Sequence, residues 1–208
     1  MKNIQRGYCV NKIKLIIKGL HEYIWGHLCV ILLYKKKYLR SKYFYGNKRL
    51  GFLGSGWGWA ISDFKARVFL RSNRGIPFPV SYGNHITNYK NIFFDPDDLI
   101  IFQGQGKYFQ AIDAPIHIGK GTYIADNVGI ITTNHDLSDP SKHMSGKPIT
   151  IGEKCWIGIN SVILPGVVLG DNTVVGAGSV VTKSFIEVGI VIAGNPAKFI
   201  KKIDNVNI

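Results

Sequence analysis

Residues 118–135 read IGKGTY-IADNVG-IITTNH, and residues 151–186 read IGEKCW-IGINSV-ILPGVV-LGDNTV-VGAGSV-VTKSFI. Written in blocks of six, both stretches open every block with an aliphatic residue. The nine block-opening residues are Ile118, Ile124, Ile130, Ile151, Ile157, Ile163, Leu169, Val175 and Val181. A period of six fits neither an α-helix nor a single strand whose side chains alternate in twos.

The period of six is typical of a chain that runs flat for about three residues, turns, and runs flat again. The second position of a block is Gly or Ala in six of the nine blocks, and we expect this small residue to form the tight turn. Flat segments stacked about 4.8 Å apart form parallel strands with an aliphatic interior. The sequence therefore predicts a parallel β-helix.

Further motifs lie between residues 133 and 202: TNHDL, KPITIGEKCWIG, PGVVLGDNTVVGAGSVVTKS and GNPAKFIKKI. Together they resemble the hexapeptide-repeat acyltransferases, and most closely the branch of maltose, galactoside and capsular polysaccharide O-acetyltransferases. The resemblance implies an all-β fold, a left-handed parallel β-helix with three blocks per coil. It also implies a homotrimer in which acetyl-CoA is the acetyl donor and a sugar or glycan hydroxyl is the acceptor, with a role in cell-surface polysaccharide synthesis.

Three parts are predicted along the chain. Residues 1–75 form a basic, partly helical extension, residues 76–193 form the β-helix, and residues 194–208 form a turn followed by a short C-terminal helix. The repeat stops after His135, so residues 136–150 are expected to be a loop extruded from a corner of the coil. Long loops on rigid scaffolds often carry functional sites.

The positive charge of the chain belongs to the N-terminal extension. Residues 1–74 hold 16 Lys and Arg against two acids, Glu22 and Asp63. The most apolar run, residues 24–34, has eleven residues, whereas a bilayer span needs about 20. We therefore expect no membrane span but helices that pack on the coil or on a neighbouring subunit; the alternative is that residues 1–50 bind an anionic membrane surface. No motif indicates nucleic-acid binding. GSGWGW lies in the turn-rich and aromatic residues 51–80, and we interpret it as a packing element because it lacks the Lys of a phosphate-binding loop.

His135 is the predicted catalytic residue, because it ends a flat segment at the mouth of the loop. Transfer of an acyl group from a thioester to an alcohol needs a base for the hydroxyl proton, and a neutral imidazole suits that task. The resemblance agrees, since the His of this motif is the family's general base, and it implies that Asn134 and Asp136 line the site. His143, in the loop, is a candidate for contact with the acceptor.

The resemblance assigns further residues to the site. Trp156 would line it, and the backbone N–H groups at Gly158 and Ile159 would stabilise the oxyanion. Thr182, Lys183 and Lys198 match positions that contact CoA. Lys201 is the next basic residue, and the small residues Gly176 and Ala177 suit a narrow groove for the pantetheine arm.

The acceptor side is less defined. Gln105, Gln110 and Asp113 are polar residues expected on the coil below His135. The maltose and galactoside branch places an Asn near the position of Gln105, so the acceptor stays open.

Other functional classes remain as alternatives. A serine acetyltransferase normally carries a larger helical N-terminal domain. A zinc-dependent carbonic anhydrase of this fold would need three converging histidines, and the spacing of His117, His135 and His143 does not resemble that class. A non-catalytic scaffold on a membrane surface is the third. The three cysteines are irregularly spaced and form no disulfide framework, so we expect no metal and a cytoplasmic protein, with peripheral binding at the inner membrane face left open.

Overall fold

A computed structural model describes residues 2–45 and 54–204 of the chain, and for residues 2–13 only the backbone. The chain divides into two compact units, Met1–Tyr82 and Gly83–Ile208, so the division lies a few residues after the expected boundary at residue 75. The last residues of the predicted 194–208 segment, and part of the extension before Gly54, lie outside the described residues.

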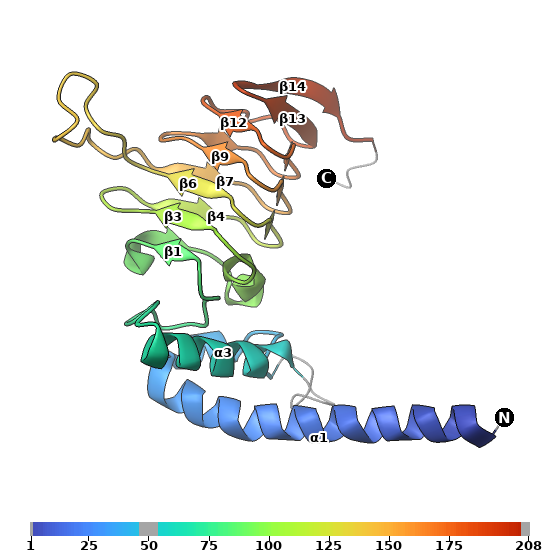
Figure 1. Cartoon of the computed structure of the whole chain (residues 1–208). Helices are drawn as coiled ribbons and strands as arrows, with labels where there is room; N and C mark the ends of the chain where they lie inside the picture. Colours follow the sequence, from blue (N-terminus) through green and yellow to red (C-terminus); the bar gives the residue numbers. More distant parts are fainter. Residues whose placement is uncertain (1, 46–53, 205–208) are drawn as a thin grey trace. The chain divides into compact units, whose positions relative to one another are not determined.

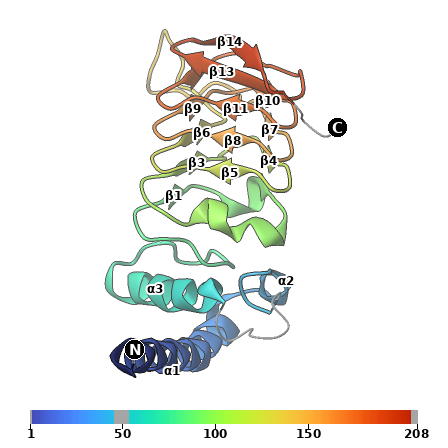
Figure 2. The same ribbon diagram turned by 90° about the vertical axis from the view of Figure 1, so that its right-hand side faces the viewer.

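The second unit is a parallel β-helix with three sheets (Figures 1 and 2). Sheet A contains β1 (His85–Ile86), β3 (Tyr108–Gln110), β6 (Gly129–Ile131), β9 (Val162–Ile163) and β12 (Val180–Val181). Sheet B contains β2 (Ile92–Phe93), β4 (Ile116–Ile118), β7 (Ile149–Ile151) and β10 (Val168–Leu169). Sheet C contains β5 (Tyr123–Ile124), β8 (Trp156–Ile157), β11 (Val174–Val175), β13 (Ile190–Gly194) and β14 (Ala197–Lys202). In Figure 2 the front strands run from right to left as the chain climbs, which makes the β-helix left-handed.

The repeat in the sequence becomes the interior of the coil. Ile118 pairs with Ile151, and Ile130 pairs with Ile163, each one coil further along. All nine block-opening aliphatic residues are buried, and none is more than 6% exposed. The predicted parallel β-helix is therefore confirmed. In the first coil, which contains η2 (Tyr89–Asn91) after β1, the 3₁₀-helix η3 (Pro96–Phe102) follows β2 where later coils have a strand of sheet C.

The turns of the coil correct one detail of the prediction. The left-handed backbone conformation falls on the fourth residue of a block, with φ of 57° at Asn127, 60° at Asn160 and 56° at Asn172. The glycine at the second position is needed for a different reason: a Cβ at Gly119 would lie 2.4 Å from backbone atoms of the next coil. Its small size therefore permits close stacking of coils, and the turn itself is made two residues later.

The predicted C-terminal helix is wrong. Residues Ala197–Lys202 form β14, which pairs antiparallel with β13 after a turn through Gly194 (φ 106°). The free edge of β13 presents unpaired backbone groups, and a returning strand satisfies them. This tertiary pairing outweighs the local preference of AKFIKK for a helix.

The first unit is helical, as expected, with α1 (Lys2–Leu33), α2 (Lys36–Leu39) and α3 (Ser55–Phe69). GSGWGW begins α3, so this part of the segment expected to be turn-rich is helical, while its close contacts agree with its interpretation as a packing element. Its glycine is required by close packing: a Cβ at Gly56 would lie 2.8 Å from the backbone oxygen of Tyr43. Likewise a Cβ at Gly26 in α1 would lie 3.0 Å from the backbone oxygen of Trp57, a residue that is fully buried.

Within the described residues, α1 contains one stretch, Lys14–Leu33, that is long and apolar enough to cross a membrane by length and composition. The prediction that this region is too short for a span is therefore wrong with respect to length. The charges at Lys18 and Glu22 interrupt the apolar run without lowering the hydropathy of the whole stretch below that of a span. Only 22% of the stretch is buried.

Candidate active site

The interruption of the repeat becomes a loop on the corner between sheets A and B. The chain leaves the coil after β6 and rejoins it at β7. The loop protrudes on the side of the β-helix opposite to β8 and β11 (Figures 1 and 2). Backbone hydrogen bonds from Met144 N to Asn134 O (2.8 Å) and from Asp136 N to Lys142 O (2.9 Å) pair its two arms. The loop is therefore an ordered hairpin that presents its base residues at a fixed place.

His135 is exposed at the base of this hairpin, and its ring is held by the backbone. Its Nδ1 lies 2.7 Å from the carbonyl oxygen of Pro140. A carbonyl oxygen only accepts hydrogen bonds, so in the neutral ring Nδ1 carries the proton and Nε2 is the basic nitrogen. The ring of His143 packs against that of His135, with centroids 4.3 Å apart. This arrangement leaves Nε2 as the ring nitrogen that is free of the Pro140 contact and could accept a proton.

Gln110, expected to face the acceptor, instead holds the backbone that leads to His135. Its Nε2 donates to the carbonyl oxygen of Thr133 (3.1 Å), and its Oε1 accepts from the Thr133 N–H (2.9 Å). The side chain is only 8% exposed. Gln110 lies one coil below Thr133, and its side chain therefore fixes the backbone of the corner that carries His135.

We predict that Gln110→Leu lowers kcat of the reaction that depends on His135 about tenfold to a hundredfold, because both backbone polar groups of Thr133 lose their partner and the backbone that carries His135 shifts. Steady-state kinetics over a range of acceptor concentrations measure it. Gln103→Leu is the matched control, since Gln103 is equally buried and bonds to the carbonyl oxygen of Leu99. Equal kcat values in the two variants would contradict the positioning role.

Several predicted site residues meet at this corner. Asn134 and Thr182 line one pocket, together with Met144, Ser145, Lys147, Leu164 and Pro165. The neighbouring Lys183 lies with its Nζ 5.6 Å from the ring centroid of Phe185. Lys147, which the sequence analysis did not single out, belongs to the KPITIG motif, and its exposed side chain adds a cation to the pocket. Asp113 is exposed between β3 and β4, at the same corner one coil below.

The other predicted residues lie on sheet C or at the corner between sheets C and A. Trp156 is 59% exposed on the outer face of β8, opposite the equally exposed Tyr123. Gly158 and Ile159 follow β8, and Gly176 and Ala177 follow β11. Gln105 is exposed in the turn before β3. One copy of the chain therefore does not bring Trp156 to His135.

The predicted oxyanion donor needs one correction. The N–H of Gly158 donates to the carbonyl oxygen of Val175 (2.9 Å) inside the sheet ladder. It is therefore engaged in the fold, which leaves the N–H of Ile159 as the candidate donor. Ile159 is 44% exposed and can be reached by a ligand.

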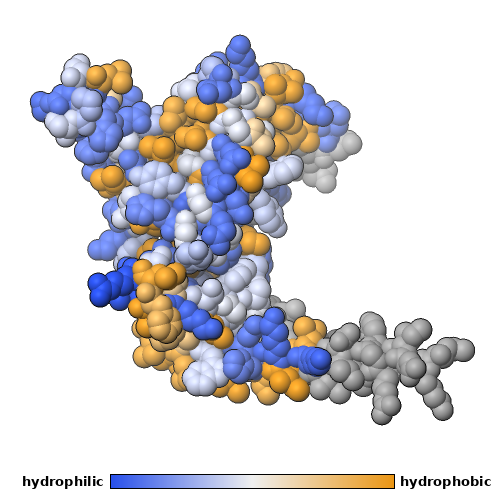
Figure 3. Space-filling view, viewed as in Figure 1, coloured by the Kyte–Doolittle hydropathy of each residue, from blue (hydrophilic) through white to orange (hydrophobic). Residues whose placement is uncertain are grey.

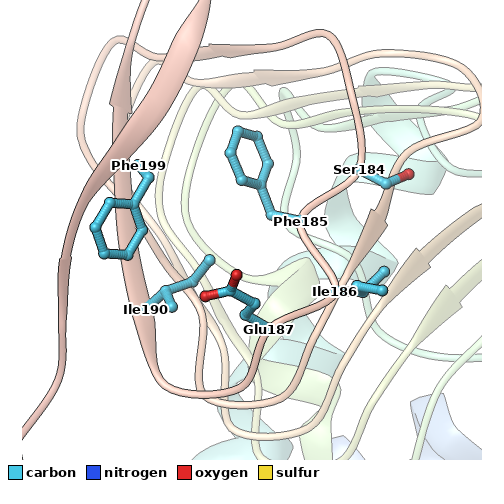
Figure 4. Close-up of a pocket in the computed structure, with 6 residues that line it drawn as sticks. All are labelled: Ser184, Phe185, Ile186, Glu187, Ile190 and Phe199. Atoms are coloured by element: carbon cyan, nitrogen blue, oxygen red, sulfur yellow. The ribbon is translucent and has the colours of Figure 1, made fainter.

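The C-terminal lysines lie on the antiparallel end of sheet C. Lys198 and Lys201 are exposed on β14. Below β14, a pocket that the sequence did not reveal is lined by Ser184, Phe185, Ile186, Glu187, Ile190 and Phe199. Figure 4 shows the rings of Phe185 and Phe199 on either side of it. Phe185 interrupts the usual small or aliphatic pattern of the coil, and that was its only signal in the sequence.

Within residues 14–45 and 54–204, whose side chains the structure describes, no group of three or more His, Cys, Asp or Glu side chains is placed to hold a metal ion. His117, one of the three histidines considered for zinc, stacks on Phe93 with ring centroids 4.9 Å apart. It lies on the outer face of β4.

Comparison with known proteins identifies the family. Residues 148–183 match the family described as bacterial transferase hexapeptide (six repeats). The chain is 32% identical over 166 residues to "Putative lipopolysaccharide biosynthesis O-acetyl transferase WbbJ" of Escherichia coli K12, covering 67% of this chain and 84% of that protein. The protein therefore belongs to the hexapeptide-repeat transferase family.

Two further relatives match a shorter region. The galactoside O-acetyltransferase of Escherichia coli K12 is 38% identical over 132 residues, which are 62% of this chain and 60% of that protein. A crystal structure of a maltose O-acetyltransferase from Clostridium difficile 630 has 38% identity and a TM-score of 0.44, and covers 60% of this chain and 61% of that one. The chain thus spans about 60% of the length of these relatives.

Proposed function

We propose that this protein is an O-acetyltransferase that moves an acetyl group from acetyl-CoA to a sugar hydroxyl, in the biosynthesis of a cell-surface polysaccharide. The observation that carries the proposal is the exposed imidazole of His135, whose Nδ1 is bound to the Pro140 carbonyl so that Nε2 is the base. The names of its relatives support both the reaction and the acceptor class, since they include a galactoside O-acetyltransferase and the lipopolysaccharide-related WbbJ.

The reaction proceeds by direct attack. His135 Nε2 removes the proton from the sugar hydroxyl as its oxygen bonds to the thioester carbonyl carbon. The N–H of Ile159 stabilises the negative charge that develops on the carbonyl oxygen. Collapse of the tetrahedral intermediate breaks the carbon–sulfur bond, and the CoA thiolate takes the proton from the imidazolium. The protein is unchanged at the end of the cycle.

The site forms between copies of the chain in a homotrimer. His135 follows β6 in the loop, whereas Trp156 lies on β8 and Ala177 follows β11. The loop and these two strands lie on opposite sides of the β-helix (Figures 1 and 2). A threefold axis brings sheet C of one copy to the loop corner of the next. The exposed aromatic rings of Tyr123 (57%) and Trp156 (59%) suit burial in that contact. The pantetheine arm lies along Gly176 and Ala177, and the phosphates meet the cations at Lys183, Lys198 and Lys201, near the Thr182 hydroxyl.

A mixing experiment tests the shared site. His135→Asn and Ala177→Trp homotrimers are each expected to be inactive, the first without a base and the second with a blocked donor groove. When the two variants mix at random, about three quarters of the trimers contain both, and each of these has one intact site out of three. About a quarter of wild-type activity is therefore expected to return. Subunits are exchanged by co-expression with two tags, and acetyl-CoA consumption is measured. Activity that stays at the level of the single variants would contradict a site shared between copies.

The acceptor is proposed to bind against the loop corner, near Asp113 and His143, with Gln105 of an adjacent copy within reach. Acetyl-CoA turnover against hexoses, nucleotide sugars and serine identifies the substrate class. Turnover with serine alone would favour the serine acetyltransferase alternative. We propose that the enzyme works in the cytoplasm at the inner face of the membrane, because acetyl-CoA is a cytoplasmic metabolite and residues 1–74 are strongly basic.

A further inference from the structure

Helix α1 is apolar on two opposite faces. One face carries Gly19, Gly26 and Val30, which are buried in the helical unit against α3. The opposite face carries a stripe of aliphatic side chains spaced three and four residues apart, and this apolar stripe consists of Ile17, Leu20, Ile24, Leu28 and Ile31. An amphipathic helix of a globular protein usually buries its apolar face against a partner, so the second apolar face of α1 lacks the contact that its composition favours.

The apolar stripe is open in the helical unit. Each of its five residues is between 50% and 71% exposed. Beside it, an apolar groove between the two helices is lined by Trp25 of α1 and by Ile61, Phe64 and Phe69 of α3, among others. Phe69 itself is 78% exposed. Figure 3 shows apolar surface, in orange, gathered over the end of α3 and the adjoining part of α1.

A cluster of positive charge adjoins the apolar stripe. The chain directly after α1 carries five exposed cations, named here the basic segment: Lys35, Lys36, Lys37, Arg40 and Lys42. Lys14 and Lys18 are also exposed on α1. Between Glu22 and Asp63 the chain has no acidic residue. The region is thus apolar and cationic together, a pairing that matches the acyl chains and headgroups of an anionic bilayer.

We propose that the helical unit docks on the surface of an anionic phospholipid bilayer, with α1 lying in the membrane plane, the apolar stripe among the acyl chains and the basic segment against the headgroups. This inference concerns where the protein sits and does not depend on the acetyl-transfer chemistry. The partner is the lipid surface itself, and no protein receptor is needed.

The packing of α1 favours this in-plane position over a span. One face of α1 is covered by α3, against which Gly26 fits closely at Trp57. Helix α3 contains the buried ion pair of Asp63 and Arg67 (2.7 Å) and exposes Lys65. An ion pair and an exposed lysine make α3 unsuited to the hydrocarbon interior. Along the part of α1 that α3 covers, from Gly19 to Val30, lipid can therefore reach the helix from one side only, as on a surface.

Vesicle sedimentation of the full-length protein tests the proposal. We expect binding to vesicles of phosphatidylcholine with phosphatidylglycerol, little binding to phosphatidylcholine alone, and release as NaCl is raised. Ile24→Glu/Leu28→Glu is expected to weaken binding about tenfold or more. Lys35→Gln/Lys36→Gln/Lys37→Gln is expected to weaken it by a similar factor. Because all five side chains are exposed, helix content measured by circular dichroism stays unchanged.

Matched controls come from the β-helix unit. Ile186→Glu replaces an aliphatic residue that is 74% exposed there, and Lys90→Gln/Lys120→Gln/Lys202→Gln removes the same number of charges. Both controls bind like the wild type. Three results would overturn the proposal. The first is vesicle binding that the α1 variants leave unchanged, and the second is membrane association that resists carbonate extraction, which indicates a span. The third is a wild type that binds no vesicles and an Ile24→Glu/Leu28→Glu variant that forms a smaller oligomer than the wild type, which together indicate that a second copy covers the stripe.

Discussion

Asparagine in place of His135 lowers kcat for acetyl transfer roughly a thousandfold, the loss expected when a general base is removed. The reason lies in the ring geometry. The Pro140 carbonyl holds Nδ1 as the donor, which presents the basic Nε2 outward from an exposed position. An asparagine side chain keeps polarity and small size but has no basic nitrogen. Single-turnover measurements with acetyl-CoA and the best sugar acceptor give the rate of the chemical step.

His143→Asn is the matched control, because its ring packs against that of His135 in the same hairpin. We expect this control to change the acceptor KM more than kcat, since the two rings share a wall of the site. Circular dichroism and size-exclusion chromatography check that both variants keep the fold and assembly of the wild type. If His143→Asn lost as much kcat as His135→Asn, the base would have to be reassigned.

The largest expected effect on stability comes from Asp63→Ala, which lowers the free energy of unfolding of the helical unit by about 3–5 kcal/mol. Asp63 is 1% exposed and Arg67 is 6% exposed, with Oδ2 of Asp63 2.9 Å from Nε of Arg67. The Tyr34 hydroxyl donates to the same oxygen at 2.5 Å. Burial and the Asp63 charge raise the pKa of Tyr34, so its hydroxyl stays a donor. Removing the carboxylate leaves the buried guanidinium of Arg67 without its opposite charge.

Urea unfolding followed at 222 nm and by tryptophan fluorescence measures this loss, since Trp57 is buried in the same unit. Tyr34→Phe removes one hydrogen bond to the carboxylate and is expected to cost about 1.5–3 kcal/mol. Asp63→Leu/Arg67→Met replaces the whole ion pair by apolar groups and recovers most of the loss. A double variant as unstable as Asp63→Ala would show that the ion pair stabilises the unit beyond satisfying its own charge.

The coil was predictable because its buried position recurs. Each block-opening residue, such as Ile130, meets the same environment one coil later, so the pattern repeats in the sequence. The reasons for the other small residues were not visible there. Gly119 is fixed by contact with the backbone of a coil some 30 residues away, and Asn127 is fixed by a left-handed turn that glycine also fills elsewhere. Sequence periodicity records burial more directly than it records backbone geometry.

The sequence alone leads to one residue of the candidate site. His135 stood at a break in the repeat, and such a break is visible without a structure. Its support was not visible: the bond to Pro140 and the clamp by Gln110 connect residues whose spacing has no pattern. The C-terminal helix was mispredicted for a related reason, since β14 forms only because β13 offers an edge. The α3 helix was missed because its glycines serve packing.

The reversed direction of β14 bears on how the stack of coils ends. An open parallel coil presents a strand edge that another β-helix could extend, and repeated extension of this kind gives fibres. Strand β14 closes the edge of sheet C within the chain and puts exposed Lys198, Lys201 and Lys202 at the new rim. Lysines on an edge strand repel a second such edge. At sheet C, the end of the coil is therefore closed to extension by the strand of another β-helix.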